Sequence, residues 1–425
     1  MNSTWSAYAS LAWLGAMLVL NGPLVPPAGA QGLKPQRLTG KVVDMRGEPI
    51  PDATVFIYTA GPKTGVSVLC PSCYADCRKR ARTDGAGAFQ IEELDPSLSF
   101  RVLAAKAGYQ ADFVSKVDPA VGPIEVKLKT SARNNENPNC SISGRILLPN
   151  GQPMEGAVII PKGVSTGDET RWGAQEDMEP LVVSDGQGRF SLFASKPFDR
   201  VTFLVEARGF AKRYFNDRKS GTKPHDLTLT EGATVSGRLV KGGKPLSGIE
   251  VGLCGVDRGA GEFIGDFTVA TDPDGRFMIV NLPPNTECFI YGRMQSLASH
   301  GSVPARRLRT AADGAVQTIG DLKVVAASNV SGRVMLSDGK PVPPDTQVML
   351  TREEAWDQKW LVADAKGRFA FNGVPDEMVH VHVRLNGYHP AAPNARLGNP
   401  GPSGRLGRIT SDRDGLVLLL EPDNP

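Results

Sequence analysis

The sequence offers little support for catalysis by histidine or by a bound metal, because its 425 residues include only five histidines. It also has almost no net charge, since 48 Lys and Arg residues stand against 45 Asp and Glu residues and leave a formal charge of +3. Neither nucleic acid nor an anionic membrane surface is therefore expected as the main partner. Long helical periodicity is missing as well, whereas 47 glycines and 33 prolines predict frequent turns.

The amino-terminal segment lacks charged side chains and contains an apolar run over residues 11–20. This run is shorter than the ~20 residues that a membrane-spanning helix needs. It leads to the sequence Ala-Gly-Ala at residues 28–30, a small-x-small pattern typical of a cleavage site. We expect residues 1–30 to be a signal peptide, with an uncleaved anchor as the alternative. The rest of the chain is then exported (secreted, periplasmic or on the cell surface) and not membrane-spanning.

Two short phrases recur four times each, and such repeats indicate architecture more firmly than any local pattern. The first is Ser/Thr-Gly-Lys/Arg and an apolar residue, followed by a Gly-x-Pro turn; its glycines are Gly40, Gly144, Gly237 and Gly332. The second is Asp-x-x-Gly-x-Phe, at residues 84–89, 185–190, 272–277 and 364–369. We interpret it as a hairpin in which Asp accepts backbone N–H bonds, Gly has positive φ and Phe enters the core.

Short alternating segments with turn signals between them predict an all-β protein with almost no helix. Each repeat is expected to be an antiparallel β-sandwich of about seven strands. The four predicted domains cover residues 36–130, 138–230, 231–327 and 328–425.

The succession of Gly-Lys/Arg-Val, Gly-x-Pro, Asp-x-x-Gly-x-Phe and Gly-Tyr phrases resembles the carboxypeptidase regulatory-like domain, over essentially all of the chain after the leader. The resemblance implies four tandem immunoglobulin-like, transthyretin-like sandwiches, a fold also grouped with carbohydrate-binding-like domains. Domains of this kind are appended to zinc metallocarboxypeptidases, and similar ones occur on exported bacterial proteins, on surface adhesins and before outer-membrane transporter barrels. The resemblance therefore predicts a fold and leaves the function open.

A metallocarboxypeptidase site needs a His-x-x-Glu pair and a distant His around an open zinc position. No histidine in the sequence is followed three residues later by Glu. The repeats also occupy the length that a catalytic domain would require. We therefore predict that the protein is not an enzyme and has no cofactor. The alternative is an accessory subunit of a carboxypeptidase-related hydrolase, or a cryptic metal-dependent hydrolase.

Two further patterns have catalytic or metal-binding interpretations that we do not favour. Residues 163–167 match the Gly-x-Ser-x-Gly nucleophile elbow, which requires a following helix, but the residues after it are polar and we expect a loop. His380 and His382 share one face of a predicted strand, where they could hold a metal. A solvent-facing or interdomain pair is the expectation for them.

Cysteine usage suits an oxidising compartment, and the six residues are Cys70, Cys73, Cys77, Cys140, Cys254 and Cys288. We expect disulfides, with Cys254 bonded to Cys288. Of the first three cysteines, two are expected to bond to each other and the third to Cys140, although three pairings among these four are open. The alternatives at these four positions are a zinc or iron–sulfur site and a redox role.

Three tryptophans follow the leader, and each precedes the Asp-x-x-Gly-x-Phe phrase of its own repeat: Trp172, Trp356 and Trp360. Phe263 and Phe267 occupy the matching stretch of the third repeat. Exposed aromatics on sandwich loops stack on sugar rings or receive a partner's side chain. Trp172 is the better surface candidate, whereas core packing is expected for the other two. We predict a binding or scaffolding protein whose partner is a cell-envelope protein or a glycan, with these three tryptophans as candidate ligand-binding residues.

Overall fold

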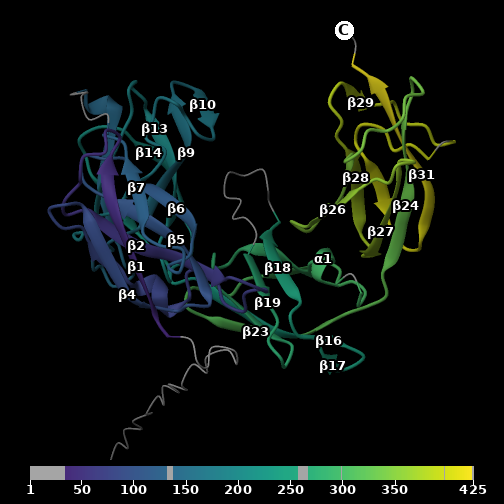
Figure 1. Cartoon of the computed structure of the whole chain (residues 1–425), viewed down its shortest axis with the longest axis horizontal. Helices are drawn as coiled ribbons and strands as arrows, with labels where there is room; N and C mark the ends of the chain where they lie inside the picture. The colour runs from purple at the N-terminus through teal and green to yellow at the C-terminus, as the bar shows by residue number, and fades with distance from the viewer. Residues whose placement is uncertain (1–33, 132–136, 257–266, 298, 397, 424–425) are drawn as a thin grey trace, which may run out of the picture. The chain divides into compact units, whose positions relative to one another are not determined.

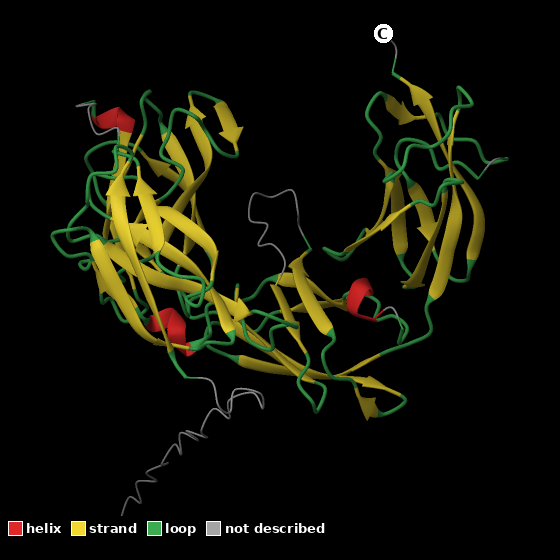
Figure 2. Cartoon of the chain, in the orientation of Figure 1, coloured by secondary structure: helices red, strands yellow, loops and turns green. Residues whose placement is uncertain are grey.

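The computed structural model describes residues 34–131, 137–256, 267–297, 299–396 and 398–423. Nearly all of their regular structure is β-strand, as Figure 1 and Figure 2 show, and the single α-helix within these ranges is α1 (Met294–Leu297). A helix long and apolar enough to cross a membrane does not occur in this part of the chain. The predicted signal peptide and Phe263 lie outside the described residues. The all-β prediction is confirmed.

The described strands fall into four consecutive sets, and each set forms two sheets that enclose one core. We call these sets the first to the fourth sandwich. The first sandwich has the sheets β4-β1-β7 and β3-β2-β5-β6. Its strands are β1 (Gln36–Asp44), β2 (Thr54–Pro62), β3 (Arg80–Arg82), β4 (Ala88–Leu94), β5 (Leu98–Ala105), β6 (Asp112–Val117) and β7 (Ile124–Leu128).

The second sandwich has the sheets β12-β8-β15 and β10-β9-β13-β14, with β11 also paired to β9. Its strands are β8 (Ser141–Leu147), β9 (Val158–Thr166), β10 (Glu169–Trp172), β11 (Val182–Val183), β12 (Arg189–Phe193), β13 (Arg200–Glu206), β14 (Arg213–Lys219) and β15 (His225–Thr228).

The third sandwich has the sheets β17-β16-β20, with β23 also on β16, and β19-β18-β21-β22. Its strands are β16 (Ala233–Lys241), β17 (Lys244–Pro245), β18 (Glu250–Gly255), β19 (Phe267–Ala270), β20 (Arg276–Leu282), β21 (Glu287–Gly292), β22 (Arg306–Arg309) and β23 (Val316–Lys323).

The fourth sandwich has the sheets β27-β24-β31-β29 and β26-β25-β28-β30. Its strands are β24 (Ser328–Leu336), β25 (Gln347–Arg352), β26 (Gln358–Val362), β27 (Arg368–Val374), β28 (Met378–Val383), β29 (Tyr388–Pro390), β30 (Arg405–Arg408) and β31 (Arg413–Pro422).

Strand pairing within each sandwich is antiparallel with one exception. The first long strand runs parallel to the last one, as in β1 with β7, β8 with β15, β16 with β23 and β24 with β31. The predicted antiparallel pairing therefore holds for most strands, and each sandwich also has one parallel pair that was not predicted.

The recurring glycine of the first phrase lies under the recurring phenylalanine of the second. Gly144 on β8 is the register partner of Phe190 on β12, and a Cβ at Gly144 would come within 2.8 Å of Cε1 of the Phe190 ring. The backbone carbonyl oxygen of His225 on β15 would be closer still, so the parallel strand and the ring together fill the place that a side chain would need, and the position requires glycine. The same register partners occur in the other sandwiches as Gly40 and Phe89, Gly237 and Phe277, and Gly332 and Phe369.

The Asp-x-x-Gly-x-Phe phrase forms the predicted turn. Asp185 Oδ1 accepts hydrogen bonds from the backbone N–H groups of Gln187 and Arg189 at 2.9 and 2.8 Å, and Gly188 has a φ of +71°. The hairpin interpretation is wrong, however, because the strands on either side lie in different sheets. In the second sandwich β11 belongs to one sheet and β12 to the other, so the turn carries the chain across the core.

A buried ion-pair cluster joins the third and fourth sandwiches around Arg352, whose side chain is fully buried. Its guanidinium donates to Glu377 Oε1 at 2.6 Å and to Asp357 Oδ2 at 3.2 Å. It also donates to the backbone carbonyls of Gly292 and Val303, in the third sandwich, at 2.8 and 3.1 Å. Burial raises the pKa of Asp357, and the Arg352 charge opposes that shift.

Candidate functional site

Trp172 lies on the edge strand β10 and is 58% exposed. Its register partner on β9 is Gly163, and a Cβ there would come within 2.9 Å of ring atoms of Trp172. Because Gly163 has no side chain, one face of the indole packs directly on its backbone, while much of the ring is exposed to solvent. The structure places this side chain on the surface, where the sequence predicted it.

The Gly-x-Ser-x-Gly pattern is part of a β-hairpin and not of a nucleophile elbow. Strand β9 runs to Thr166, Gly167 turns with a φ of +60°, and β10 follows in place of a helix. Ser165 is buried and its hydroxyl lies 2.8 Å from the hydroxyl of Thr170. The loop expected for this segment was wrong, because cross-strand pairing with β10 and β13 continues the strand.

Trp356 and Trp360 are 50% and 46% exposed, so the expectation that they pack in the core is wrong. Strand β26 lies at the edge of its sheet, and its exposed residues alternate with half-buried ones. Leu361 points to the core of the fourth sandwich, and Trp360 lies on the opposite face. Neighbouring residues of a strand face opposite sides of the sheet, but the sequence does not show which side faces the core.

The sheet β26-β25-β28-β30 brings Trp360 into line with the histidine pair. Met349 on β25 is the register partner of both Trp360 and His382, so the three side chains form one row across three strands. The rings of His380 and His382 stack with centroids 6.1 Å apart and planes 4° apart. The alternating pattern of the sequence predicts both histidines on one strand face but does not reveal this row, because strand register is not visible in a single sequence.

The histidine pair shows no sign of a metal site within the described residues. No group of three His, Cys, Asp or Glu side chains there is arranged to hold an ion. His380 Nε2 lies 3.4 Å from Glu353 Oε2, and its Nδ1 lies 3.2 Å from the carbonyl of Ser403. Burial, the neighbouring His380 and Arg384 lower the pKa of His382.

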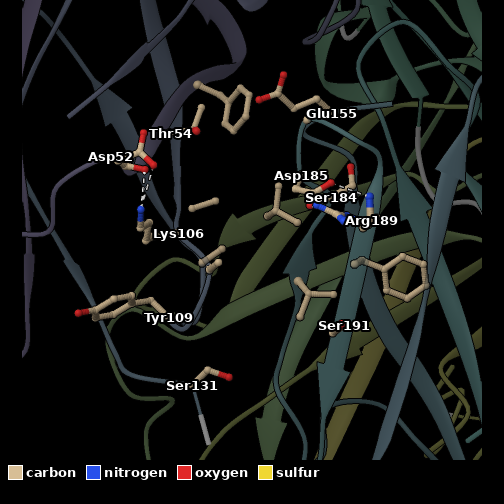
Figure 3. Close-up of a pocket in the computed structure, with 18 of the residues that line it drawn as sticks. Asp52, Thr54, Lys106, Tyr109, Ser131, Glu155, Ser184, Asp185, Arg189 and Ser191 are labelled. Carbon is tan, nitrogen blue, oxygen red and sulfur yellow. Dashed lines mark hydrogen bonds and ion pairs between the residues drawn. The ribbon is translucent and has the colours of Figure 1, made fainter. Parts of the chain in front are cut away.

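A polar cleft of about 410 Å³ is lined by residues of the first and second sandwiches, as Figure 3 shows. On one side Asp52 is paired with Arg82 at 2.6 Å and with Lys106 at 3.1 Å. The hydrogen bond from Arg82, and then that from Lys106, lower the pKa of Asp52. On the other side Asp185 is paired with Arg189 at 3.0 Å. In the same cleft the hydroxyl of Ser131 donates to Glu179 Oε1, and Glu179 Oε2 accepts from the backbone N–H of Phe193 at 3.0 Å.

The cysteines form one disulfide, between Cys70 and Cys73, whose Cα atoms are 5.1 Å apart. This bond agrees with the prediction that two cysteines of the insertion pair with each other. The third, Cys77, is buried in the first core, and burial raises the pKa of its thiol to about 12. The predicted bond between it and Cys140 is not formed.

The predicted disulfide between Cys254 and Cys288 is wrong. Cys254 is the register partner of Phe289, and Cys288 is that of Gly255, so the two sulfurs lie on opposite faces of the sheet. Cys288 packs in the third core, where burial raises the pKa of its thiol to about 12. Cys254 packs with Tyr291 on the other face.

No family model matches the sequence, and no curated protein matches it. Solved structures similar to the chain include a streptococcal ancillary pilin, with 10% identity, 68% of this chain and 98% of that chain covered, and a TM-score of 0.23. The shaft pilin SpaA of Lactobacillus rhamnosus GG has 13% identity, coverage of 46% and 99%, and a TM-score of 0.19. The Bacillus anthracis TIE protein has 11% identity, coverage of 93% and 75%, and a TM-score of 0.18. At such scores the comparisons carry no argument about function.

Proposed function

We propose that the protein is an exported, non-catalytic binding or scaffolding protein, built of modules of the carboxypeptidase regulatory-like kind, that recognises a cell-envelope protein or a glycan. The observation that carries this proposal is the exposure of tryptophan on two edge strands, at Trp172 of β10 and Trp360 of β26. Neither side chain contributes to the core of its sandwich. Exposed tryptophans are the residues that most often dominate binding energy.

Scaffolding suits the rest of the surface. The acidic residues of the cleft and of the Asp turns are engaged by neighbouring Arg and Lys side chains or by backbone N–H groups, so they hold turns and strands in place. Aromatic side chains on such a frame present a rigid contact area at little entropic cost, because a tryptophan has only two side-chain torsions.

The proposal is tested by immobilising the purified chain, exposing it to cell-envelope extract and to a glycan panel, and identifying what stays bound. Trp172→Ala is expected to weaken retention of the ligand several-fold, while the melting temperature stays nearly unchanged because the ring packs mainly on Gly163. An equal loss of retention and thermal stability would assign Trp172 a packing role instead. If the chain retained no protein and no glycan, the proposal would be overturned and a purely structural spacer would be the remaining interpretation.

The competing function, a metal-dependent hydrolase or its accessory subunit, is separated from this one by elemental analysis of the purified chain. We expect zinc far below one equivalent. Stoichiometric zinc that resists dialysis would favour the hydrolase.

A further inference from the structure

We propose that the outer face of the sheet β26-β25-β28-β30 is a platform that binds an anionic glycan, a polysaccharide carrying carboxylate or sulfate groups. This inference rests on the proposed function and assigns its site and ligand class. We call this surface the outer platform; its residues are Gln347, Met349, Thr351, Gln358, Trp360, Val362, His380, His382, Arg384 and Arg405.

Strand register places the side chains of the outer platform in rows that run across the strands. In one row Trp360, Met349 and His382 lie side by side on β26, β25 and β28. With strands about 4.8 Å apart, the indole and the imidazole of this row are attached roughly 10 Å from each other. Such a row spans the width of more than one sugar ring, with the aromatic ring at one end and a hydrogen-bonding ring at the other.

A second row runs beside the first and is polar throughout. Gln358, Thr351, His380 and Arg405 are successive register partners across all four strands of the sheet. Their amide, hydroxyl, imidazole and guanidinium groups are donors or acceptors of hydrogen bonds. The platform therefore offers an apolar ring next to a line of hydrogen-bonding groups, the combination that sugars require, since their rings have apolar faces and hydroxyl edges.

The charges on this face favour an anion. Arg384 follows the strand on the same face as His382, close enough that its charge lowers the pKa of that histidine, and within the described residues it forms no ion pair. Arg405 lies 3.8 Å from Glu353, which also lies near His380 at 3.4 Å. One carboxylate is thus shared between a guanidinium and an imidazole, and Arg384 is left to receive a charge from a ligand.

The outer platform is too polar for a stable protein interface. Its large exposed apolar side chains are Trp360 and Val362. The core of a protein–protein interface is depleted in charged residues and rich in apolar area, whereas here arginines and histidines surround a single indole. A flat sheet face with one stacking ring and with Arg384 available to a negative charge matches a charged polysaccharide better than a folded partner.

Binding of dextran, dextran sulfate and polygalacturonate to the purified chain tests the inference, measured as dissociation constants at fixed ionic strength because contacts between charges are screened by salt. We expect both anionic polymers to bind and neutral dextran not to. Trp360→Ala and Arg384→Ala should each weaken binding at least tenfold. The matched controls are Met278→Ala and Arg200→Ala, an exposed apolar residue of the third sandwich and an exposed arginine of the second, which should change it less than twofold.

The outcomes separate the inference from the function on which it rests. If a glycan binds but only the Trp172→Ala variant loses affinity, the proposed function stands and the outer platform is the wrong site. If the chain captures an envelope protein and no glycan, the inference is overturned while the broader function survives. Equal weakening by Arg200→Ala and Arg384→Ala would indicate a non-specific attraction and would also overturn it. Melting temperatures of all variants within about 2 °C of the parent exclude misfolding as the cause.

Discussion

At the scale of single residues, a glycine and a phenylalanine act as one unit in each sandwich. The ring of Phe190 covers Gly144 from the neighbouring strand, and no atom of a side chain fits between them. Both phrases are visible in the sequence, and the turn chemistry of the second one is predictable from Asp and Gly alone. Their contact is not predictable, because it depends on a register between strands that are distant along the chain.

We expect Gly144→Ala to destabilise the second sandwich by about 1–3 kcal/mol, because the added methyl group overpacks against the backbone carbonyl of His225 and the ring of Phe190. Gly186→Ala is the matched control, since nothing lies within 4 Å of a Cβ at that position. Differential scanning calorimetry of the two variants measures the difference. Equal melting profiles for both would contradict the role assigned to the ring.

At the scale of elements, the edge strands differ most from what the sequence indicates. Along the edge strand β26 exposed residues alternate with half-buried ones, and pairing with β25 decides that Trp360 faces outward. Likewise Cys254 and Cys288 lie on the adjacent strands β18 and β21, and a register offset of one residue places their side chains on opposite faces of the sheet. Periodicity predicts elements, whereas pairing decides which residues meet.

The buried ion-pair cluster around Arg352 gives a prediction about stability. Arg352→Met leaves Glu377 buried without its ion-pair partner and leaves Asp357 with Arg293, 3.8 Å from its Oδ1, and we expect a loss of roughly 3–5 kcal/mol in the unfolding free energy. The control Arg145→Met, which removes an exposed ion pair with Asp226, should have little effect. Fluorescence of Trp356 and Trp360 reports the unfolding of this region.

The defect of Arg352→Met should shrink as the pH falls from 8 to 5. Burial raises the pKa of Asp357 and the Arg352 charge lowers it, so loss of Arg352 raises this pKa further in the folded variant. The variant therefore takes up the proton at a higher pH than the parent, and it regains stability as the pH falls through that folded pKa. A defect that is constant across this range would show that the lost cation is not the cause.

The outer platform gives a second pH prediction, which concerns affinity. His382 is faced by His380 and Arg384 and, across a shallow pocket, by His389, which pairs with Asp423 at 3.0 Å and with Glu421 at 3.8 Å. Because the pKa of His382 is lowered, this side chain is neutral at pH 7 and becomes cationic on acidification. Affinity for dextran sulfate should therefore rise from pH 7 to pH 5, and His382→Gln should reduce the rise.

At the scale of the whole molecule, four consecutive sandwiches follow from the repeated phrases, and this much is available from sequence because each copy carries its own turns and core residues. Which cysteines form a disulfide and which remain thiols could not be predicted from the sequence. Strand register decides where each thiol side chain is buried. The one disulfide joins Cys70 and Cys73, which are only three residues apart.

Thiol titration checks this distribution. We expect four cysteines to react with Ellman's reagent in denaturant and almost none in the native protein, because all four are buried and the thiols of Cys77 and Cys288 have pKa values near 12. If no thiol of the denatured chain reacted, these four cysteines would be in disulfides, as the sequence predicted.

The parallel pairing of each sandwich's first and last long strands has a mechanical consequence. When a chain is stretched from both ends, β8 is drawn in one direction and β15 in the other, so their ladder is loaded in shear and its hydrogen bonds must give way together. Antiparallel terminal strands would instead peel apart one bond at a time. Each module is thereby built to transmit tension along the polypeptide without unravelling.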